Sequence, residues 1–173
     1  MNIKKAFAVI NQMQSDGIVA RYAIGGAIGA TFYLEPSQTY DIDVFVILNP
    51  RPGQMLVTLQ SIHDYLGAQG WTVDQQGNSD INGTPVQFLP AGSPLLSEAL
   101  EQSVEHDYAG TSVTVFTAPH LAAVALDVGR SKDKVRLLQF LEWEGFPVEE
   151  FSHILERHGL LERWRRFKSQ MAE

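Results

Sequence analysis

Cysteine is absent from the 173-residue sequence, which excludes a disulfide framework and a thiolate metal site. A long apolar run is also missing, because the longest apolar helix candidate, near Leu121, is interrupted by Asp127 and is too short to span a bilayer. The N-terminal residues carry charge, but neither an apolar core nor a cleavage site follows them, so no signal peptide is indicated. We therefore expect a cytoplasmic protein with no membrane partner.

Basic residues are fewer than acidic ones: 13 lysines and arginines stand against 20 aspartates and glutamates, for a net charge of −7. This balance argues against non-specific nucleic-acid binding through bulk electrostatics, although it leaves room for a local basic patch. Hydrophobic residues make up 45% of the chain, which is enough to bury the core of one domain. We expect an α/β core over residues 1–117 and, packed on it, a C-terminal helical segment over residues 118–173.

Two aspartates open a stretch that has the composition of a buried strand, residues 40–48. Because a strand alternates its faces, Asp41 and Asp43 point the same way, about 6.6 Å apart along the backbone. Two carboxylates that close resist being ionised together unless a cation lies between them. The pattern therefore favours a hard divalent ion such as Mg²⁺, which accepts one or two carboxylates and keeps room for phosphate oxygens. The alternative is a solvated turn at the mouth of a strand.

Gly25 and Gly26 follow a short apolar strand, residues 22–24, and precede a helix expected over residues 27–34. Glycine lets the backbone turn sharply and lets a phosphate approach its N–H groups. A tight turn with no ligand is the alternative. Since residues 22–24 and 44–48 are both apolar enough to be adjacent core strands, we expect the glycines and the aspartates to meet.

A strand, Gly-Gly, a helix and then Asp-apolar-Asp on the next strand resembles the nucleotidyltransferase superfamily of the DNA polymerase β type. Within it, residues 39–43 and Arg130-Ser131-Lys132-Asp133 are similar to minimal bacterial proteins grouped with the AbiEii abortive-infection toxins. The resemblance covers residues 20–48 closely and residues 80–136 loosely. It implies an α+β fold of α/β-like character, with a mixed sheet flanked by helices and a C-terminal helical segment.

The resemblance also implies a reaction: an acceptor hydroxyl attacks the α-phosphate of a nucleoside triphosphate, and pyrophosphate leaves. Asp41 and Asp43 would hold Mg²⁺. The implied substrate-binding residues are Gly25, Gly26, Thr39, Arg130, Lys132 and Asp133, with Asp133 orienting one of the two cations. For residues 130–133 the alternative is a surface ion-pair cluster on a helix.

Gln87 departs from the family pattern. It occupies the position between two apolar strand residues where the superfamily has a third catalytic carboxylate. A carboxamide is neutral and cannot serve as a base at neutral pH, so its presence predicts weak activity or none. Asp74 or Asp80 could substitute, but nothing in the sequence places either on the required face.

Three hypotheses follow: an active or weakly active nucleotidyltransferase, a protein of the same fold that binds nucleotide or a partner without catalysis, and an unrelated α/β interaction module. The acceptor of an active enzyme could be a small molecule, RNA or protein, and the AbiEii resemblance implies an antitoxin-like protein partner. The basic tail from Arg157 to Lys168 is either a solvated helix face or a docking surface for RNA or another acidic partner.

The remaining elements are expected from periodicity, capping and turn residues. Ser93 is the expected cap of a short helix with Pro94 in its first turn, and His120, near the start of a later helix, is expected on the surface although it could face the cleft. The other expected elements are helices over 2–15, 54–68, 148–158 and 160–168, strands over 71–76 and 84–90, and a hairpin around Gly110.

Overall fold

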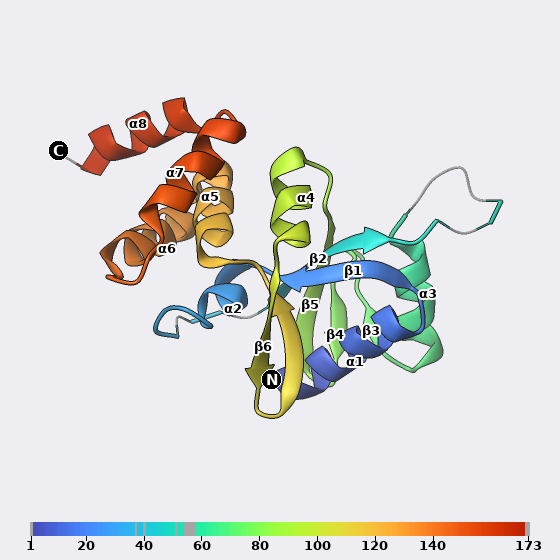
Figure 1. The fold of residues 1–173 in the computed structure, drawn as a ribbon. Coiled ribbons are helices and arrows are strands. Elements are labelled where there is room, and N and C mark those ends of the chain that lie inside the picture. The colour runs from blue at the N-terminus through green and yellow to red at the C-terminus, as the bar shows by residue number, and fades with distance from the viewer. Residues whose placement is uncertain (1, 37, 40, 51, 54–57, 172–173) are drawn as a thin grey trace.

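The computed structural model describes residues 2–36, 38–39, 41–50, 52–53 and 58–171 (Figure 1). Helices and strands are interspersed up to β7, and the rest of the chain is helical. In chain order the elements are α1 (Ile3–Ser15), β1 (Val19–Ile24), α2 (Gly26–Ala30), β2 (Ile42–Leu48), α3 (Gln60–Ala68), β3 (Thr72–Val73), β4 (Ser79–Ile81), β5 (Thr84–Pro90), α4 (Pro94–Glu101), β6 (Val104–Tyr108), β7 (Thr111–Val115), α5 (Ala118–Val128), α6 (Ser131–Glu142), α7 (Val148–Arg157) and α8 (Leu161–Met171).

The strands form one mixed sheet in the order β3-β4-β5-β2-β1-β7-β6. At its centre β2 runs antiparallel to β1 and parallel to β5, and β1 runs parallel to β7. The outer pairs β3/β4, β4/β5 and β6/β7 are antiparallel. This arrangement confirms the expected α+β fold with a mixed sheet flanked by helices.

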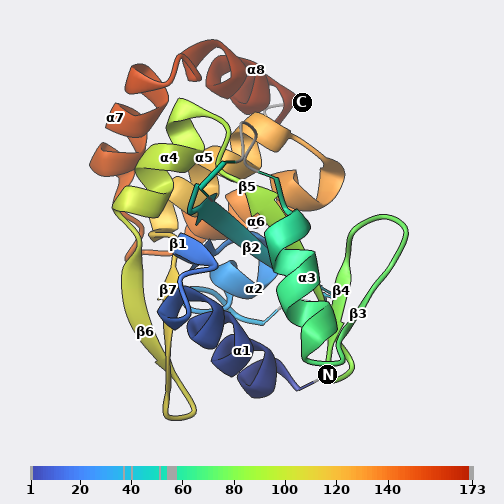
Figure 2. The same ribbon diagram turned by 90° about the vertical axis from the view of Figure 1, so that its right-hand side faces the viewer.

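The faces of the central strands separate two hydrophobic clusters, because successive side chains of a strand point to opposite sides. On β2, Val44 and Val46 lie in the cluster that contains residues of α1 and α3, which lie together on the near side in Figure 2. Phe45 lies in the opposite cluster, with residues of α4 and α5. Since Asp43 shares the phase of Phe45, the pleat directs its carboxylate to the α4/α5 face, while Asp41 lies one residue before the strand.

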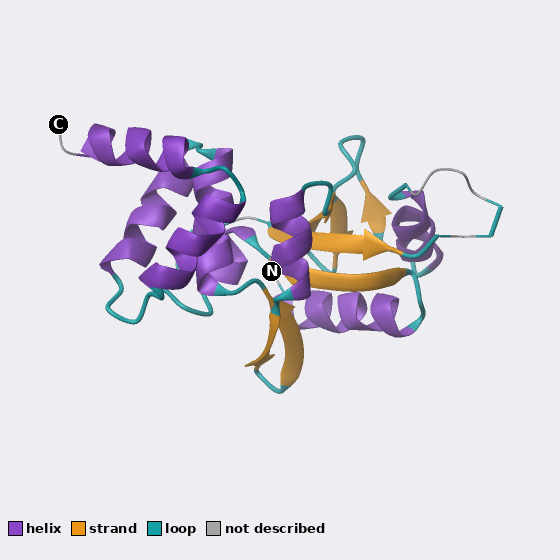
Figure 3. Ribbon diagram, turned by 45° about the horizontal axis from the view of Figure 1, so that its top comes forward, coloured by secondary structure: helices purple, strands orange, loops and turns teal. Residues whose placement is uncertain are grey.

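Helices α5–α8 gather beyond one end of the sheet (Figure 3). Their aromatic rings contact one another, with centroid separations of 5.4 Å between Phe146 and Phe151 and 5.5 Å between Phe151 and Trp164. The hydrophobic cluster that contains Phe146 and Phe151 also contains Phe45 of β2, so apolar packing is continuous from the sheet into these helices. The division of the chain at residue 117 stays a prediction. In the described part of the chain, no helix combines the length and apolar character needed to cross a membrane.

Caps and turn residues define the ends of several elements, and the predicted cap at Ser93 and turn at Gly110 are confirmed. Ser93 caps α4, since its hydroxyl accepts the N–H of Leu96 at 3.2 Å, and Pro94 is the first residue of the helix. Gly129 ends α5 with a φ of 70°, a left-handed conformation that glycine adopts without a side-chain clash. The hairpin of β6 and β7 turns at Gly110, as expected.

Two predicted helices are shorter in the structure. The helix expected over residues 27–34 ends at Ala30, where the hydroxyl of Thr31 donates to the carbonyl of Ile28 at 2.7 Å and the chain continues as turns. The helix expected over residues 54–68 is α3 from Gln60 onwards; residues 54–57 lie outside the described residues.

The strand predicted over residues 71–76 is wrong beyond Val73. The carboxylate of Asp74 accepts the backbone N–H groups of Gln76 and Asn78, each at 2.8 Å, and this turn ends the strand. Residues 79–81, which carry turn signals in the sequence, form the short strand β4 because they pair with β5.

His120 is fully buried, so its expected surface position is wrong. Helix α5 is apolar around most of its circumference and is inserted between the sheet and the other C-terminal helices, which covers its first turn. The ring Nε2 of His120 donates to Glu98 of α4 at 3.2 Å, and Nδ1 pairs with the hydroxyl of Thr117 at 2.7 Å.

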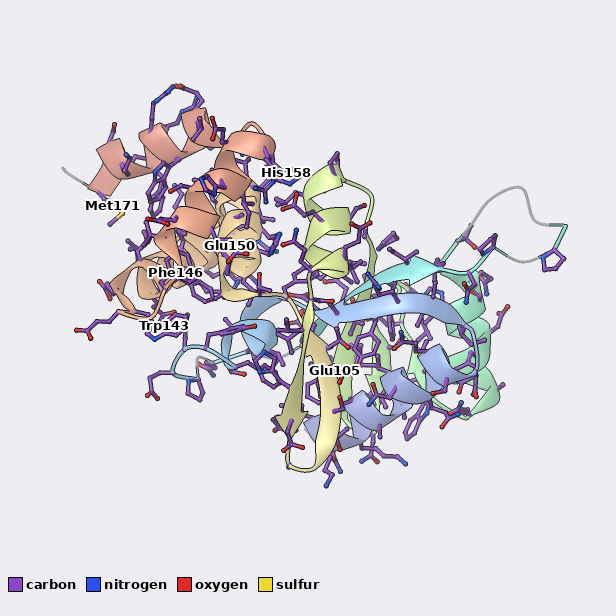
Figure 4. The ribbon with its side chains drawn as sticks, viewed as in Figure 1. Glu105, Trp143, Phe146, Glu150, His158 and Met171 are labelled. Atoms are coloured by element: carbon purple, nitrogen blue, oxygen red, sulfur yellow. The ribbon has the colours of Figure 1, made fainter. Side chains whose placement is uncertain are left out.

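Glu98 joins three helices. Besides His120 of α5, its carboxylate accepts hydrogen bonds from Arg157 at the end of α7, at 2.5 Å, and from the adjacent His158, at 2.7 Å. Figure 4 labels His158, which lies beside α4. The hydrogen bond from Arg157, followed by those from His158 and His120, outweighs partial burial and lowers the pKa of Glu98 to about 2. The charged form of Glu98 is therefore favoured in the folded protein and helps to hold α7 against α4.

Glu98→Gln should lower the free energy of unfolding at pH 7 by about 1.5–3 kcal/mol, the usual range for hydrogen bonds to a charged group. Because the folded pKa lies below the unfolded value near 4.5, this stabilisation is present above pH 4.5 and is lost as the pH falls towards 2. Urea denaturation at a series of pH values measures the difference between variant and parent.

The matched control is Glu101→Gln, on the same helix, whose exposed carboxylate makes no hydrogen bond or ion pair within the described residues. A Glu98→Gln cost that equals the Glu101→Gln cost, or that persists unchanged at pH 3, would show that the carboxylate does not hold the helices together.

Candidate functional site

Gly26 brings the turn after β1 against the side chain of Asp43. Its φ is +57°, and a Cβ placed on it would lie 1.9 Å from Oδ2 of Asp43. This distance is too short for any residue with a side chain. The neighbouring Gly25 donates its N–H to the backbone carbonyl of Asp43 at 3.0 Å. The glycines and the aspartates therefore meet, as the sequence predicts.

The carboxylate of Asp43 is in an unfavourable environment for its charge. Burial raises its pKa, and the negative charge of Asp41 raises it further, while the positive charges of Lys132, Arg130 and Arg136 lower it. Asp41 and Asp43 line the same cavity. Two repelling carboxylates in one partly buried site fit a divalent cation, which would replace their repulsion by attraction.

Gln87 stands beside Asp43 in the parallel register of β2 and β5, and it lines the same cavity. A carboxamide therefore lies beside Asp43, on the face that the sequence predicts for Gln87. Neither suggested substitute reaches this face, because Asp74 binds the backbone of its own turn and Asp80 accepts the N–H of Gly83 at 2.7 Å. Within the described residues, no group of three or more histidines, aspartates or glutamates is placed to hold a metal ion.

The start of α6 supplies the positive charge opposite these carboxylates. Asp133, only 2% exposed, accepts a hydrogen bond from Nε of Arg130 at 2.7 Å and another from Nη1 of Arg136 at 3.1 Å. Asp133 is therefore buried beneath the two guanidinium groups, although the side chain of Arg130 is itself 60% exposed. Lys132, which lies between Arg130 and Arg136 in the sequence, also lines the cavity.

Arg136 is the charged residue of the site that sequence reasoning missed. It lies one helical turn after Lys132, on the same side of α6, and it lines the cavity. The i, i+4 spacing of two cations beyond a predicted phosphate-binding segment is the signal that could have found it.

The cavity has a volume of about 400 Å³ and lies between the sheet, α4, α5 and the start of α6. One part of it is polar and the other aliphatic. The polar part is lined by Gly26, Asp41, Asp43, Gln87, Arg130, Lys132, Asp133 and Arg136, and the aliphatic part mainly by Leu89, Leu95, Leu96, Leu121, Val124, Ala125 and Val128.

Two predicted site residues do not line this cavity. Gly25 is packed against the core, since a Cβ placed on it would lie 2.4 Å from the ring of Phe45. Thr39 lines an adjoining groove together with Asp41, Lys132 and Arg136, and its hydroxyl donates to the backbone carbonyl of Asp41 at 3.3 Å. Both residues therefore support the position of an aspartate, through the backbone of Asp43 and Asp41 respectively.

No protein-family model matches the chain, and no curated protein matches it significantly. A solved structure of an antigenic nucleotidyltransferase-like protein from Paracoccidioides brasiliensis is similar, with a TM-score of 0.60 and 15% sequence identity, over 97% of this chain and 91% of that one. This similarity shows that the chain has the fold of that nucleotidyltransferase-like protein.

Two structures of the antibiotic-resistance factor ANT(2'')-Ia are more distant, each with a TM-score of 0.46. The solution structure is 14% identical over 99% of this chain and 95% of that one. The crystal structure, in complex with adenylyl-2''-tobramycin, is 12% identical over 96% of this chain and 98% of that one.

The contact between Gly26 and Asp43 predicts an unusual cost for a single methyl group. Gly26→Ala should lower the free energy of unfolding by at least about 2 kcal/mol, because the new Cβ adds an overlap to the cost of a positive φ. Chemical denaturation measures this cost.

Gly83→Ala is the matched control, since Gly83 also has a positive φ, +77°, but has no atom within 4 Å of its added Cβ. The double variant Gly26→Ala/Asp43→Ala should recover part of the stability that Gly26→Ala alone loses, because the overlapping carboxylate is gone. Equal costs at positions 26 and 83, with no coupling to position 43, would mean that the turn and the carboxylate are not in contact.

Proposed function

We propose that the protein binds a Mg²⁺–nucleoside triphosphate in this cavity and transfers the nucleoside monophosphate slowly to an acceptor hydroxyl. The observation that carries the proposal is that two like-charged carboxylates, Asp43 of β2 and Asp41 just before it, share a cavity with the cationic residues Arg130, Lys132 and Arg136. Carboxylates on one side and cations on the other suit a metal-bound polyphosphate, which presents both kinds of charge.

Each side chain has a separate part in this reaction. Asp41 and Asp43 would hold Mg²⁺, which supplies charge neutralisation on the phosphate oxygens. The cations at the start of α6 would bind the phosphates, with Asp133 fixing the positions of Arg130 and Arg136. Gly26 would lie beside the triphosphate, whereas Gly25, whose N–H donates to the carbonyl of Asp43, would only support the turn.

The chemical step forms a bond from the acceptor oxygen to the α-phosphorus and breaks the bond from that phosphorus to the bridging oxygen, releasing pyrophosphate. The hydroxyl proton has to pass to water, because Gln87 cannot accept it. Loss of one electrostatic catalytic group costs about 10²–10³-fold in rate, so we expect slow turnover.

A non-catalytic role is the second candidate, and Gln87 is the observation that favours it. In this case the same cavity binds nucleotide without transfer.

The motifs at residues 39–43 and 130–133 support a place among the minimal AbiEii toxin-like proteins, and an antitoxin-like partner is an inference from that likeness alone. The acceptor class, whether small molecule, RNA or protein, would be found by incubating the protein with labelled triphosphates and each class in turn.

Asp41→Asn should abolish the Mg²⁺-dependent part of nucleoside triphosphate binding, because it removes one of the two charges that hold the ion. Isothermal titration with Mg²⁺, and again with a chelator, separates this part from binding to the cations alone. Asp64→Asn, on the exposed side of α3, is the matched control. If Asp41→Asn binds as the parent does in Mg²⁺, the carboxylate pair is not a metal site and the proposal fails.

Gln87→Asp should strengthen Mg²⁺ binding and raise the transfer rate by about 10²-fold or more, since it restores a third carboxylate beside Asp43. Without metal the added charge is repelled, so the variant should also be less stable than the parent and recover more stability on adding Mg²⁺. Thermal unfolding with and without Mg²⁺ gives this second readout.

Gln87→Asn keeps the amide and controls for the change in size. An increased response of stability to Mg²⁺ without any transfer would favour the non-catalytic role. No change in Mg²⁺ response would contradict the placement of Gln87 at the metal site.

A further inference from the structure

The aliphatic part of the cavity is continuous with its polar part along two strands. On β2, Phe45 follows Asp43 by two residues. On β5, Leu89 follows Gln87 by two residues. Residues two apart on a strand share a face and are separated by about 7 Å. The floor of the cavity therefore changes from carboxylate and carboxamide to apolar side chains within one step along the sheet.

Helices α4 and α5 complete the aliphatic part. On α5, Leu121, Val124 and Val128 recur at i, i+3 and i+7, so one stripe of the helix faces the cavity. From α4, Leu95 and Leu96 approach it. Val124 and Leu96 are only half-buried, which leaves apolar surface available to a ligand.

Polar groups that could read the edge of a nucleobase are scarce here. Among the described residues of this part, Asp127 is the only one with a polar side chain, and Arg163 of α8 engages it: Nε lies 3.6 Å from Oδ1, and Nη1 donates to its backbone carbonyl at 3.0 Å. The adjacent carbonyl of Ala125 accepts the N–H of Gly129, and the N–H of Leu96 is taken by Ser93.

We propose that this aliphatic part receives the base of the nucleotide and selects it by shape and apolar contact, so that the protein takes purine and pyrimidine triphosphates alike. The proposal rests on the function proposed above and adds the class of substrate. A site that hydrogen-bonds its ligand rejects an analogue lacking the partner by about 10⁴-fold or more, whereas an apolar pocket discriminates far less. The aliphatic part of this cavity is an apolar pocket of this less discriminating kind.

Titration of the protein with ATP, GTP, CTP, UTP and inorganic tripolyphosphate, all in saturating Mg²⁺, tests the proposal. We expect the four nucleotide Kd values to lie within about tenfold of one another. Tripolyphosphate should bind at least about tenfold more weakly, because it lacks the group that the aliphatic part receives. Purines should bind more tightly than pyrimidines, since they bury more apolar area.

Val124→Asn should weaken all four nucleotides by a similar factor and leave tripolyphosphate unchanged, because it places an amide in the aliphatic wall without changing the charge. Leu96→Asn, on the facing helix, repeats the test should the first variant fold poorly. Val148→Asn, at a 58% exposed valine of α7 outside the cavity, should change neither affinity.

One nucleotide binding more than about 100-fold more tightly than the other three would overturn the proposal, and so would tripolyphosphate binding as tightly as the nucleotides. An unchanged nucleotide affinity in both Val124→Asn and Leu96→Asn would also overturn it. In each of these cases Mg²⁺-dependent binding of a polyphosphate persists, so the proposed function stands. Failure of both nucleotides and tripolyphosphate to bind would instead refute the proposed function, and this inference with it.

Discussion

Repulsion between two carboxylates at the start of a central strand is the constraint around which the cavity is arranged. The pleat of β2 sends Asp43 to the α4/α5 side, because Val44 and Val46 are committed to the opposite cluster, and Asp41, one residue before the strand, lines the same cavity. A slip of one residue would expose those valines on the wrong face and carry both aspartates into the core. The position of the acidic pair is thus determined by hydrophobic burial, although the pair itself is unfavourable.

The surrounding elements keep this repulsion in place and partly offset it. Gly26 lets the turn after β1 press against Asp43, which shields the carboxylate from water and raises its pKa. The cations at the start of α6 lower its pKa again, and the buried Asp133 holds two of them, Arg130 and Arg136. Across the cavity, α4 and α5 form an aliphatic wall, and Glu98 ties both helices to α7. The C-terminal helices therefore contribute cations, an apolar surface and the contacts that hold that surface in position.

Periodicity and turn chemistry could predict the parts of the site that depend on local sequence. Strand alternation predicts a common side for Asp41 and Asp43, and both line one cavity. The family resemblance, not periodicity, predicts Gln87 beside them, and the parallel register pairs it with Asp43. The contacts that escaped prediction join residues far apart in the chain. His120 was expected on the surface because nothing near it in sequence reveals that Glu98 and α7 cover it. Strand β4 is missing from the expected elements for the same reason, since only its pairing with β5 makes it a strand.

The central claim is that Asp43 carries a charge that the folded protein disfavours and a divalent cation would stabilise. A direct test is to follow the carboxyl ¹³C resonance of Asp43 by NMR through a pH titration, first without and then with saturating Mg²⁺. The structure predicts a pKa above the ordinary aspartate value in the absence of metal, and a marked fall when Mg²⁺ is added. An ordinary pKa without metal, or a raised pKa that Mg²⁺ leaves unchanged, would contradict the account.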